Sequence, residues 1–254
     1  TDSSVVAMLL RALGGPPYSI TAHAKDIYRD TVDPARLSAL IEGSLRGCLV
    51  CTGTVRLKIK GRLTGLLDAQ HLLVEKGAEL ADGVEIGPFC VVSAKAKLGE
   101  NVKLVSHVSV AGSTTIGSRT QVFPFAALGH PPQDTKYKGE DTQLIIGSDN
   151  LIREGATFHL GTTQGRGKTV VGSRGFLMNG SHVGHDNIVG NNVIYATHAV
   201  SGGLATIDDF VILGGNSAIH QLGRIGMGAF IGGCAPVVGD VIPFGMVDNH
   251  GNLN

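Results

Sequence analysis

The segment His182-Val183-Gly184-His185-Asp186 combines the side chains best suited to move a proton. A neutral imidazole with an ordinary pKa takes a proton from a hydroxyl group near neutral pH, and an adjacent carboxylate can fix its tautomer and stabilise the imidazolium. We therefore predict that His185 acts as a general base and that Asp186 orients it. The alternative interpretation is that these histidines only hydrogen-bond to neighbouring residues or line a subunit interface.

A six-residue repeat determines the elements that must position this segment. A branched apolar residue occupies every sixth position in one unbroken run: Val74, Leu80, Ile86, Val92, Leu98, Leu104, Val110, Ile116, Val122 and Leu128. The pattern returns after two breaks and weakens at Tyr195 and Ser201. Its later members are Ile146, Ile152, Phe158, Val171, Leu177, Val183, Val189, Ile207, Leu213, Ile219, Ile225, Ile231 and Val237.

The six-residue period excludes the common amphipathic patterns. A helix would repeat every three or four residues, and a half-buried strand would alternate by two. The period is typical of a parallel β-helix, in which three hexads form one triangular coil and each coil buries its inner face by stacking on the next. The sequence therefore predicts an all-β solenoid of about eight coils over residues 67–254. We expect glycine to supply the positive φ of its sharp turns.

A coil of 18 residues also predicts which side chains are neighbours. Adding 18 places His185 beside Gly203 and then Gln221, while Gly184 precedes Gly202 and His220 in the adjoining column. The exposed amide of Gly203 could then donate to the oxyanion of a tetrahedral intermediate. The arrangement suggests direct acyl transfer without a covalent enzyme intermediate.

Three segments depart from the repeat. Residues 129–143 and 159–170 interrupt it and must form loops, where functional residues are often found. Residues 1–66 lack the repeat and predict a small α+β appendage that caps the solenoid or docks on a partner. In this appendage Asp33-Pro34 predicts the start of a short helix that ends near Ser44, and the alternation over 55–60 predicts a strand.

The composition limits the classes of protein to consider. The chain has 254 residues and a net charge of zero, and it contains neither an apolar run of membrane-spanning length nor a polybasic segment. We expect no membrane span and no nucleic-acid partner. The four cysteines, of which only Cys48 and Cys51 are close in sequence, favour free thiols in a reducing compartment. We expect a cytoplasmic protein, or one of an organellar matrix if the source is eukaryotic.

From about Gly83 onward the chain resembles a known family. The matching motifs are Ile86-Gly87-Pro88-Phe89-Cys90, Ser106-His107-Val108, the loop 132–140, Ile152-Arg153-Glu154, the 182–186 segment, Ala218-Ile219-His220-Gln221 and Ile231-Gly232-Gly233. They resemble, in order and spacing, the acyl-acyl-carrier-protein:UDP-N-acetylglucosamine O-acyltransferases of lipid A synthesis. The loop is the discriminating part, because the repeat alone fits many acetyltransferases.

The resemblance implies a fold, a reaction and a set of site residues. It implies a left-handed helix and a homotrimer with sites between subunits. The reaction would move a 3-hydroxyacyl group from acyl carrier protein to the 3-hydroxyl of UDP-N-acetylglucosamine without a cofactor. His185, Asp186 and Gly203 would be the base, its orienting carboxylate and the oxyanion donor. The other implied residues are Asp134 and Lys136 from across an interface, His182, His220 and Gln221 around the sugar and acyl groups, and Gly233 at the acyl-chain end.

Two alternatives accompany this interpretation. Leu204 replaces a histidine of the family, Thr197 and His198 replace paired asparagines, and the family's helical domain has no counterpart before Asn254. These departures would also fit a catalytically weak or silent β-helix that serves as a structural subunit, including one in an organelle. A zinc site built from three histidines, as in hexapeptide helices of the γ-carbonic-anhydrase kind, is the second alternative.

Overall fold

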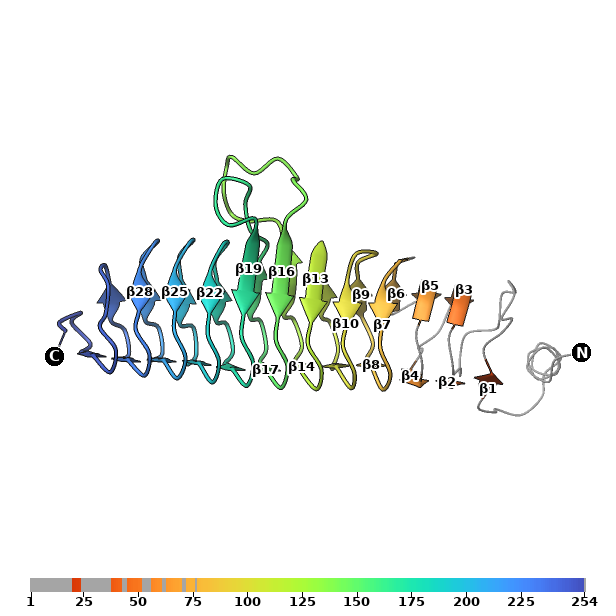
Figure 1. The fold of residues 1–254 in the computed structure, drawn as a ribbon. Helices are drawn as coiled ribbons and strands as arrows, with labels where there is room; N and C mark the ends of the chain where they lie inside the picture. The colour runs from red at the N-terminus through yellow and green to blue at the C-terminus, as the bar shows by residue number, and fades with distance from the viewer. Residues whose placement is uncertain are drawn as a thin grey trace, which may run out of the picture.

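The computed structural model describes residues 20–23, 38–42, 45–51, 56–60, 63–69, 72–75 and 77–253, with side chains from residue 73 onward. Every regular element within these residues is a β-strand. Short parallel strands stack along one axis as the coils of a triangular prism (Figure 1). The structure confirms the left-handed parallel β-helix and places about eight coils in it.

Three parallel sheets form the faces of the prism. The first face contains β7 (Glu79–Leu80), β10 (Lys97–Leu98), β13 (Ser113–Ile116), β16 (Gln143–Ile146), β19 (Lys168–Val171), β22 (Ile188–Val189), β25 (Thr206–Ile207) and β28 (Arg224–Ile225). The second contains β8 (Glu85–Ile86), β11 (Lys103–Leu104), β14 (Gln121–Val122), β17 (Leu151–Ile152), β20 (Phe176–Leu177), β23 (Ile194–Tyr195), β26 (Ile212–Leu213), β29 (Phe230–Ile231) and β31 (Met246–Val247). The third contains β6 (Leu72–Val74), β9 (Cys90–Val92), β12 (Ser109–Val110), β15 (Ala127–His130), β18 (Thr157–His159), β21 (His182–Val183), β24 (Val200–Ser201), β27 (Ala218–Ile219) and β30 (Pro236–Val237).

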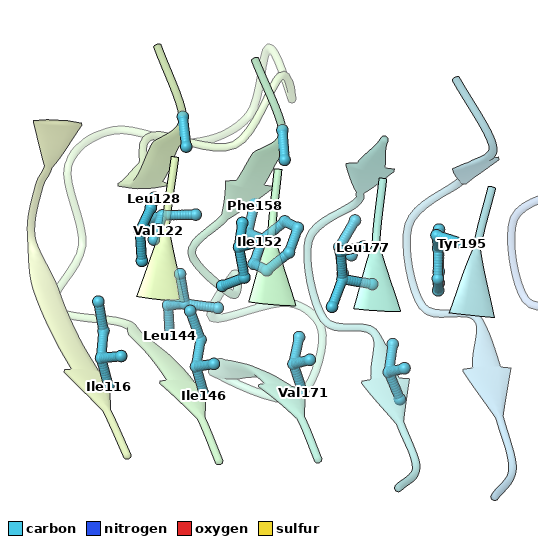
Figure 2. Packing of buried hydrophobic residues seen from close by; sticks show 14 of the residues in the cluster. Ile116, Val122, Leu128, Leu144, Ile146, Ile152, Phe158, Val171, Leu177 and Tyr195 are labelled. Atoms are coloured by element: carbon cyan, nitrogen blue, oxygen red, sulfur yellow. The ribbon is translucent and has the colours of Figure 1, made fainter. Parts of the chain in front are cut away.

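The predicted hexad residues form the core. All ten members of the first run are at most 2% exposed. In Figure 2 the labelled side chains project between the faces into the interior, each next to its equivalents in neighbouring coils. Burial of one such aliphatic side chain stabilises the fold by about 1.5–3 kcal/mol. A column of equivalent residues therefore fixes the register of the coils.

Glycine supplies the predicted positive φ in some of the turns, such as the one at Gly155 with φ 68°. The left-handed position of most turns holds a residue other than glycine, such as Asp186 with φ 59° and Leu204 with φ 65°. Gly87 and Gly117, which follow buried isoleucines, have no positive φ, and a Cβ at either one would collide with the backbone of the next coil. Close approach of the coils, rather than turn conformation, requires glycine at these positions.

The two weak positions of the repeat compensate each other. Tyr195 and Ser201 both point inward and both are fully buried. The Tyr195 hydroxyl lies 3.0 Å from the Ser201 hydroxyl, so a large and a small polar side chain replace two aliphatic ones and share a hydrogen bond. Burial raises the pKa of Tyr195, whose hydroxyl therefore stays protonated.

Both predicted loops leave the same edge of the prism. The first lies between His130 and Gln143, and the second lies between His159 and Lys168, within three residues of the predicted bounds. They project side by side from the corner between the third and first faces (Figure 1). Beyond them the register returns to 18 residues, as in the pairing of Val170 with Ile188.

The prediction of a short helix near residues 33–44 is wrong, because Ser38–Glu42 form strand β2. The appendage contains β1 (Ile20–His23), β2, β3 (Leu45–Cys51), β4 (Arg56–Lys60) and β5 (Leu63–Ala69), and β4 matches the predicted strand. β2 pairs with β4, and β3 pairs with β5, each at an offset of 18 residues. Pairing between strands overrides the local helix signal. Antiparallel pairs of β4 with β8 and of β5 with β6 and β7 join this segment to the first coils, and an end cap remains our proposal for it.

We predict that Ser201→Ala lowers the free energy of unfolding by about 1–3 kcal/mol, because it leaves the buried Tyr195 hydroxyl without a partner. Urea denaturation of the two proteins measures the difference. The double variant Tyr195→Phe/Ser201→Ala should lose less stability than the sum of the single variants. Unchanged stability of Ser201→Ala would show that the hydroxyl pair contributes nothing.

Candidate active site

The corner that carries the two loops also carries the predicted catalytic segment. β21 ends at Val183, residues 184–187 form the turn, and β22 begins at Ile188. Leu204 occupies the turn position equivalent to Asp186 in the next coil and donates its amide to the His185 carbonyl oxygen at 2.8 Å. The coil arithmetic is confirmed, because His185 and Gly203 lie in consecutive coils at this corner.

Asp186 is a fully buried carboxylate surrounded by donors. It accepts hydrogen bonds from the Thr162 hydroxyl at 2.7 Å, the Thr162 amide at 3.0 Å and the Arg166 amide at 2.7 Å. Burial favours the neutral acid, but the hydrogen bonds from Thr162, His185 and Arg166 outweigh it and hold the pKa of Asp186 below its usual value. Asp186 is therefore an anion at neutral pH.

His185 lies between this anion and the next coil. Its Nδ1 is 2.9 Å from Asp186 Oδ2, and its side chain is 17% exposed. The ring packs directly over Gly203, where a Cβ would collide with Nε2. Because the carboxylate accepts a proton at Nδ1, the lone pair of Nε2 is the basic site. In the described part of the chain the Gly203 amide donates to no acceptor, and Gly203 is buried, not exposed as the sequence suggested.

Loop residues that the sequence analysis did not single out complete the site. Thr162 and Arg166 bind the carboxylate of Asp186, and Gly165 packs against it so closely that a Cβ would collide with the carboxyl group. The Arg166 guanidinium also donates to the carbonyl oxygens of Asp186 and Leu204. The six-residue pattern predicted that this segment is a loop, but the pattern carried no signal for the contacts of its residues with Asp186.

Leu204 does not remove a partner of Asp186. The sequence suggested that leucine at this position alters the polar surroundings of the catalytic pair. In the structure His185 and the loop residues Thr162 and Arg166 supply the donors to the carboxylate, and Leu204 takes part only through its backbone. The hydrogen-bonded His185–Asp186 pair is therefore intact beside this leucine.

A row of further histidines lies on the third face beside the site. The Nδ1 atom of His182 is hydrogen-bonded to the Thr157 hydroxyl at 2.8 Å. The His182 and His159 rings pack edge to face, with their centroids 4.9 Å apart. Burial, together with the neighbouring imidazoles, lowers the pKa of His159 to about 4. Burial also lowers the pKa of His182. Both side chains are neutral at pH 7, and His159 was missed because it occurs where the repeat breaks.

The remaining predicted residues lie farther from His185. His220 and Gln221 are exposed at the same corner, in the second coil beyond it. Gly233 is exposed at the other edge of the third face, in the turn before β30. Asp134 and Lys136 belong to the first loop, where the Asp134 carboxylate accepts the Lys136 amide at 2.9 Å. Among the described residues no contact joins these two side chains to His185.

The described residues lack two features. They contain no cluster of three or more histidine, cysteine, aspartate or glutamate side chains arranged to hold a metal ion. They also contain no helix with the length and apolar character needed to cross a bilayer.

Comparison with known proteins gives a consistent set of relatives. The acyl-[acyl-carrier-protein]–UDP-N-acetylglucosamine O-acyltransferase of Rhizobium johnstonii is 45% identical over 181 residues, which cover 71% of this chain and 66% of the relative. The crystal structure of the Moraxella catarrhalis UDP-N-acetylglucosamine O-acyltransferase is 38% identical, has a TM-score of 0.71 and covers 72% of each chain. The Arabidopsis UDP-N-acetylglucosamine acyltransferase is 29% identical, with a TM-score of 0.63. No protein-family profile matches the chain.

The coil architecture and the His–Asp pair at a loop-bearing corner are typical of the hexapeptide-repeat acyltransferases. The similarity to the Moraxella structure identifies the family more closely. The chain belongs to the UDP-N-acetylglucosamine O-acyltransferase family, as the sequence motifs predicted. It spans 66% of the length of the Rhizobium relative, just under two thirds.

The histidine row predicts a pH dependence of stability. The pKa of His159 is about 4 in the folded protein, against about 6.5 for an unperturbed imidazole, so between these values the unfolded chain binds more protons. Stability should therefore fall as the pH decreases from about 6.5 to 4, with a contribution from His159 on the order of 3 kcal/mol. Urea denaturation at several pH values should show a shallower decline for His159→Gln. An equally steep decline in that variant would assign the effect to other groups.

Proposed function

We propose that this chain transfers a 3-hydroxyacyl group from acyl carrier protein to the 3-hydroxyl of UDP-N-acetylglucosamine. The observation that carries the proposal is the hydrogen bond between the half-buried His185 and the buried Asp186, with the His185 ring packed against Gly203. Membership of the acyltransferase family supports the substrates, because the relatives are named for them.

The geometry supports a single-displacement reaction. His185 Nε2 removes the proton of the sugar 3-hydroxyl while the sugar oxygen attacks the thioester carbonyl carbon. The amide of Gly203 donates to the oxyanion of the tetrahedral intermediate. When the intermediate collapses, the carbon–sulfur bond breaks and the leaving thiolate takes the proton from the His185 imidazolium. Asp186 stabilises this imidazolium, since its hydrogen bonds keep the carboxylate ionised.

The other predicted residues have binding roles in this proposal. His182, His220 and Gln221 would line the sugar and acyl groups along the corner, and Gly233 would limit the acyl chain at the far edge of the third face. The site would take Asp134 and Lys136 from a neighbouring subunit. Within the described part of the chain no contact joins either side chain to His185, and the loop that carries them is closed by its own hydrogen bonds.

A homotrimer is part of the same proposal. An aromatic column is exposed at the corner between the second and third faces, where the Phe89 and His107 rings stack at 4.5 Å and the His107 and Phe125 rings lie 5.0 Å apart. Phe89 is 46% exposed and Phe125 is 66% exposed. Burial of such a column against a second copy of the chain would supply apolar contact area for assembly.

The alternative of a silent structural subunit has no specific observation in its favour. Leu204 was one of the departures that suggested it, and this residue removes no donor from Asp186. The hydrogen bonds that keep a buried carboxylate charged are what a general base needs from its partner. We therefore retain the enzyme as the proposed function.

We predict that His185→Ala lowers the turnover number by about 10²–10⁴-fold, because the sugar 3-hydroxyl then has no general base. The measurement is transfer of labelled acyl groups from a panel of acyl carrier proteins to UDP-N-acetylglucosamine. His250→Ala, which changes an exposed histidine in the last turn, is the matched control and should retain full activity. Full turnover by His185→Ala, or no transfer from any donor by the folded wild type, would contradict the proposal.

A further inference from the structure

Asn187 is a fully buried side chain that joins two turns of the site. Its Nδ2 donates to the carbonyl oxygen of Gly184 at 2.9 Å and to that of Gly202 at 2.7 Å. The first carbonyl belongs to the turn that carries His185, and the second belongs to the turn that carries Gly203. Two carbonyl oxygens can face only the donor end of an amide, so they fix the orientation of the Asn187 side chain.

The contact with Gly202 determines the direction of the next amide. In a trans peptide the C=O and the following N–H point in opposite directions, and the described residues contain no cis peptide. Since the Gly202 carbonyl is held toward the interior by Asn187, the Gly203 N–H points outward. The His185 ring packs against the same glycine, because a Cβ built on Gly203 would collide with it.

We propose that Asn187 is a positioning residue that aims the Gly203 amide at the reacting carbonyl. This inference rests on the proposed function, in which Gly203 is the oxyanion donor. Asn187 is too deeply buried to contact the substrate, so it acts only through the peptide that it holds. Its contact with Gly184 also holds the backbone of the turn that carries His185. Asn187 thus fixes the position of His185 relative to the Gly203 amide.

Asn150 provides an internal comparison. It occupies the equivalent place in a turn at a different corner, between β16 and β17, and its Nδ2 also bridges two carbonyl oxygens, Gly147 at 2.9 Å and Gly172 at 2.8 Å. Its Oδ1 accepts the Gly175 amide at 2.7 Å, whereas the Oδ1 of Asn187 has no partner. Asn150 therefore joins two neighbouring turns as Asn187 does, but none of the predicted catalytic residues lies in those turns.

The experiment compares Asn187→Ala and Asn187→Ser with Asn150→Ala. Steady-state kinetics with UDP-N-acetylglucosamine and acyl carrier protein give kcat, KM and the pH profile, and thermal unfolding reports stability. We expect both Asn187 variants to lose at least about tenfold in kcat, because a misdirected oxyanion donor raises the barrier, with KM within about threefold of wild type. The pH profile should keep its midpoint, because His185 and Asp186 are unchanged.

The control separates positioning from stability. Asn150→Ala should lower the melting temperature at least as much as Asn187→Ala, because Asn150 makes one more hydrogen bond, and should retain kcat within about threefold. The inference is overturned if the Asn187 variants keep the wild-type kcat, if they change KM alone, or if Asn150→Ala loses kcat equally. If His185→Ala is inactive while the Asn187 variants are fully active, only this inference fails. Activity in His185→Ala would instead refute the proposed function.

Discussion

Stacking of equivalent residues at an interval of 18 is the constraint on which the rest of the structure depends. A strand of two residues cannot bury an apolar surface alone, so each coil is stable only on its neighbours. The aliphatic columns hold the coils in register, and glycine at positions such as Gly87 and Gly117 allows the backbones to approach closely. Extra residues are accommodated where they leave the wall at one corner, as both loops do. The candidate site occupies that same corner.

The second loop makes a buried charge tolerable. An isolated carboxylate with no solvent exposure would take up a proton instead of remaining charged. Thr162 and Arg166 provide the donors that keep Asp186 ionised, and Gly165 leaves room for the loop to close over it. The rigid coil positions His185 against Gly203, while the loop determines the charge state of the pair. In the proposed reaction the coils thus supply the position of the base, and the loop supplies the negative charge beside it.

The repeat predicted most of the fold because a six-residue period has a direct structural cause. Inward positions, coil neighbours and the two loops follow from counting, and so does the proximity of His185 to Gly203. Contacts made by residues outside the period do not follow from it, which is why Thr162, Arg166 and His159 were missed. The strand over Ser38–Glu42 was mistaken for a helix, since local signals there compete with pairing to β4. In the sequence Tyr195 and Ser201 are two separate weak positions of the repeat, and only the structure shows that their hydroxyls are hydrogen-bonded.

The central claim is that the His185–Gly203 corner is the place where acyl transfer occurs. A crystal structure with 3-O-acylated UDP-N-acetylglucosamine bound tests it most directly. We predict that the sugar 3-oxygen lies about 3 Å from His185 Nε2 and that the acyl carbonyl oxygen accepts the Gly203 amide. A product bound at another face, or at this corner with neither oxygen near these two groups, would contradict the account.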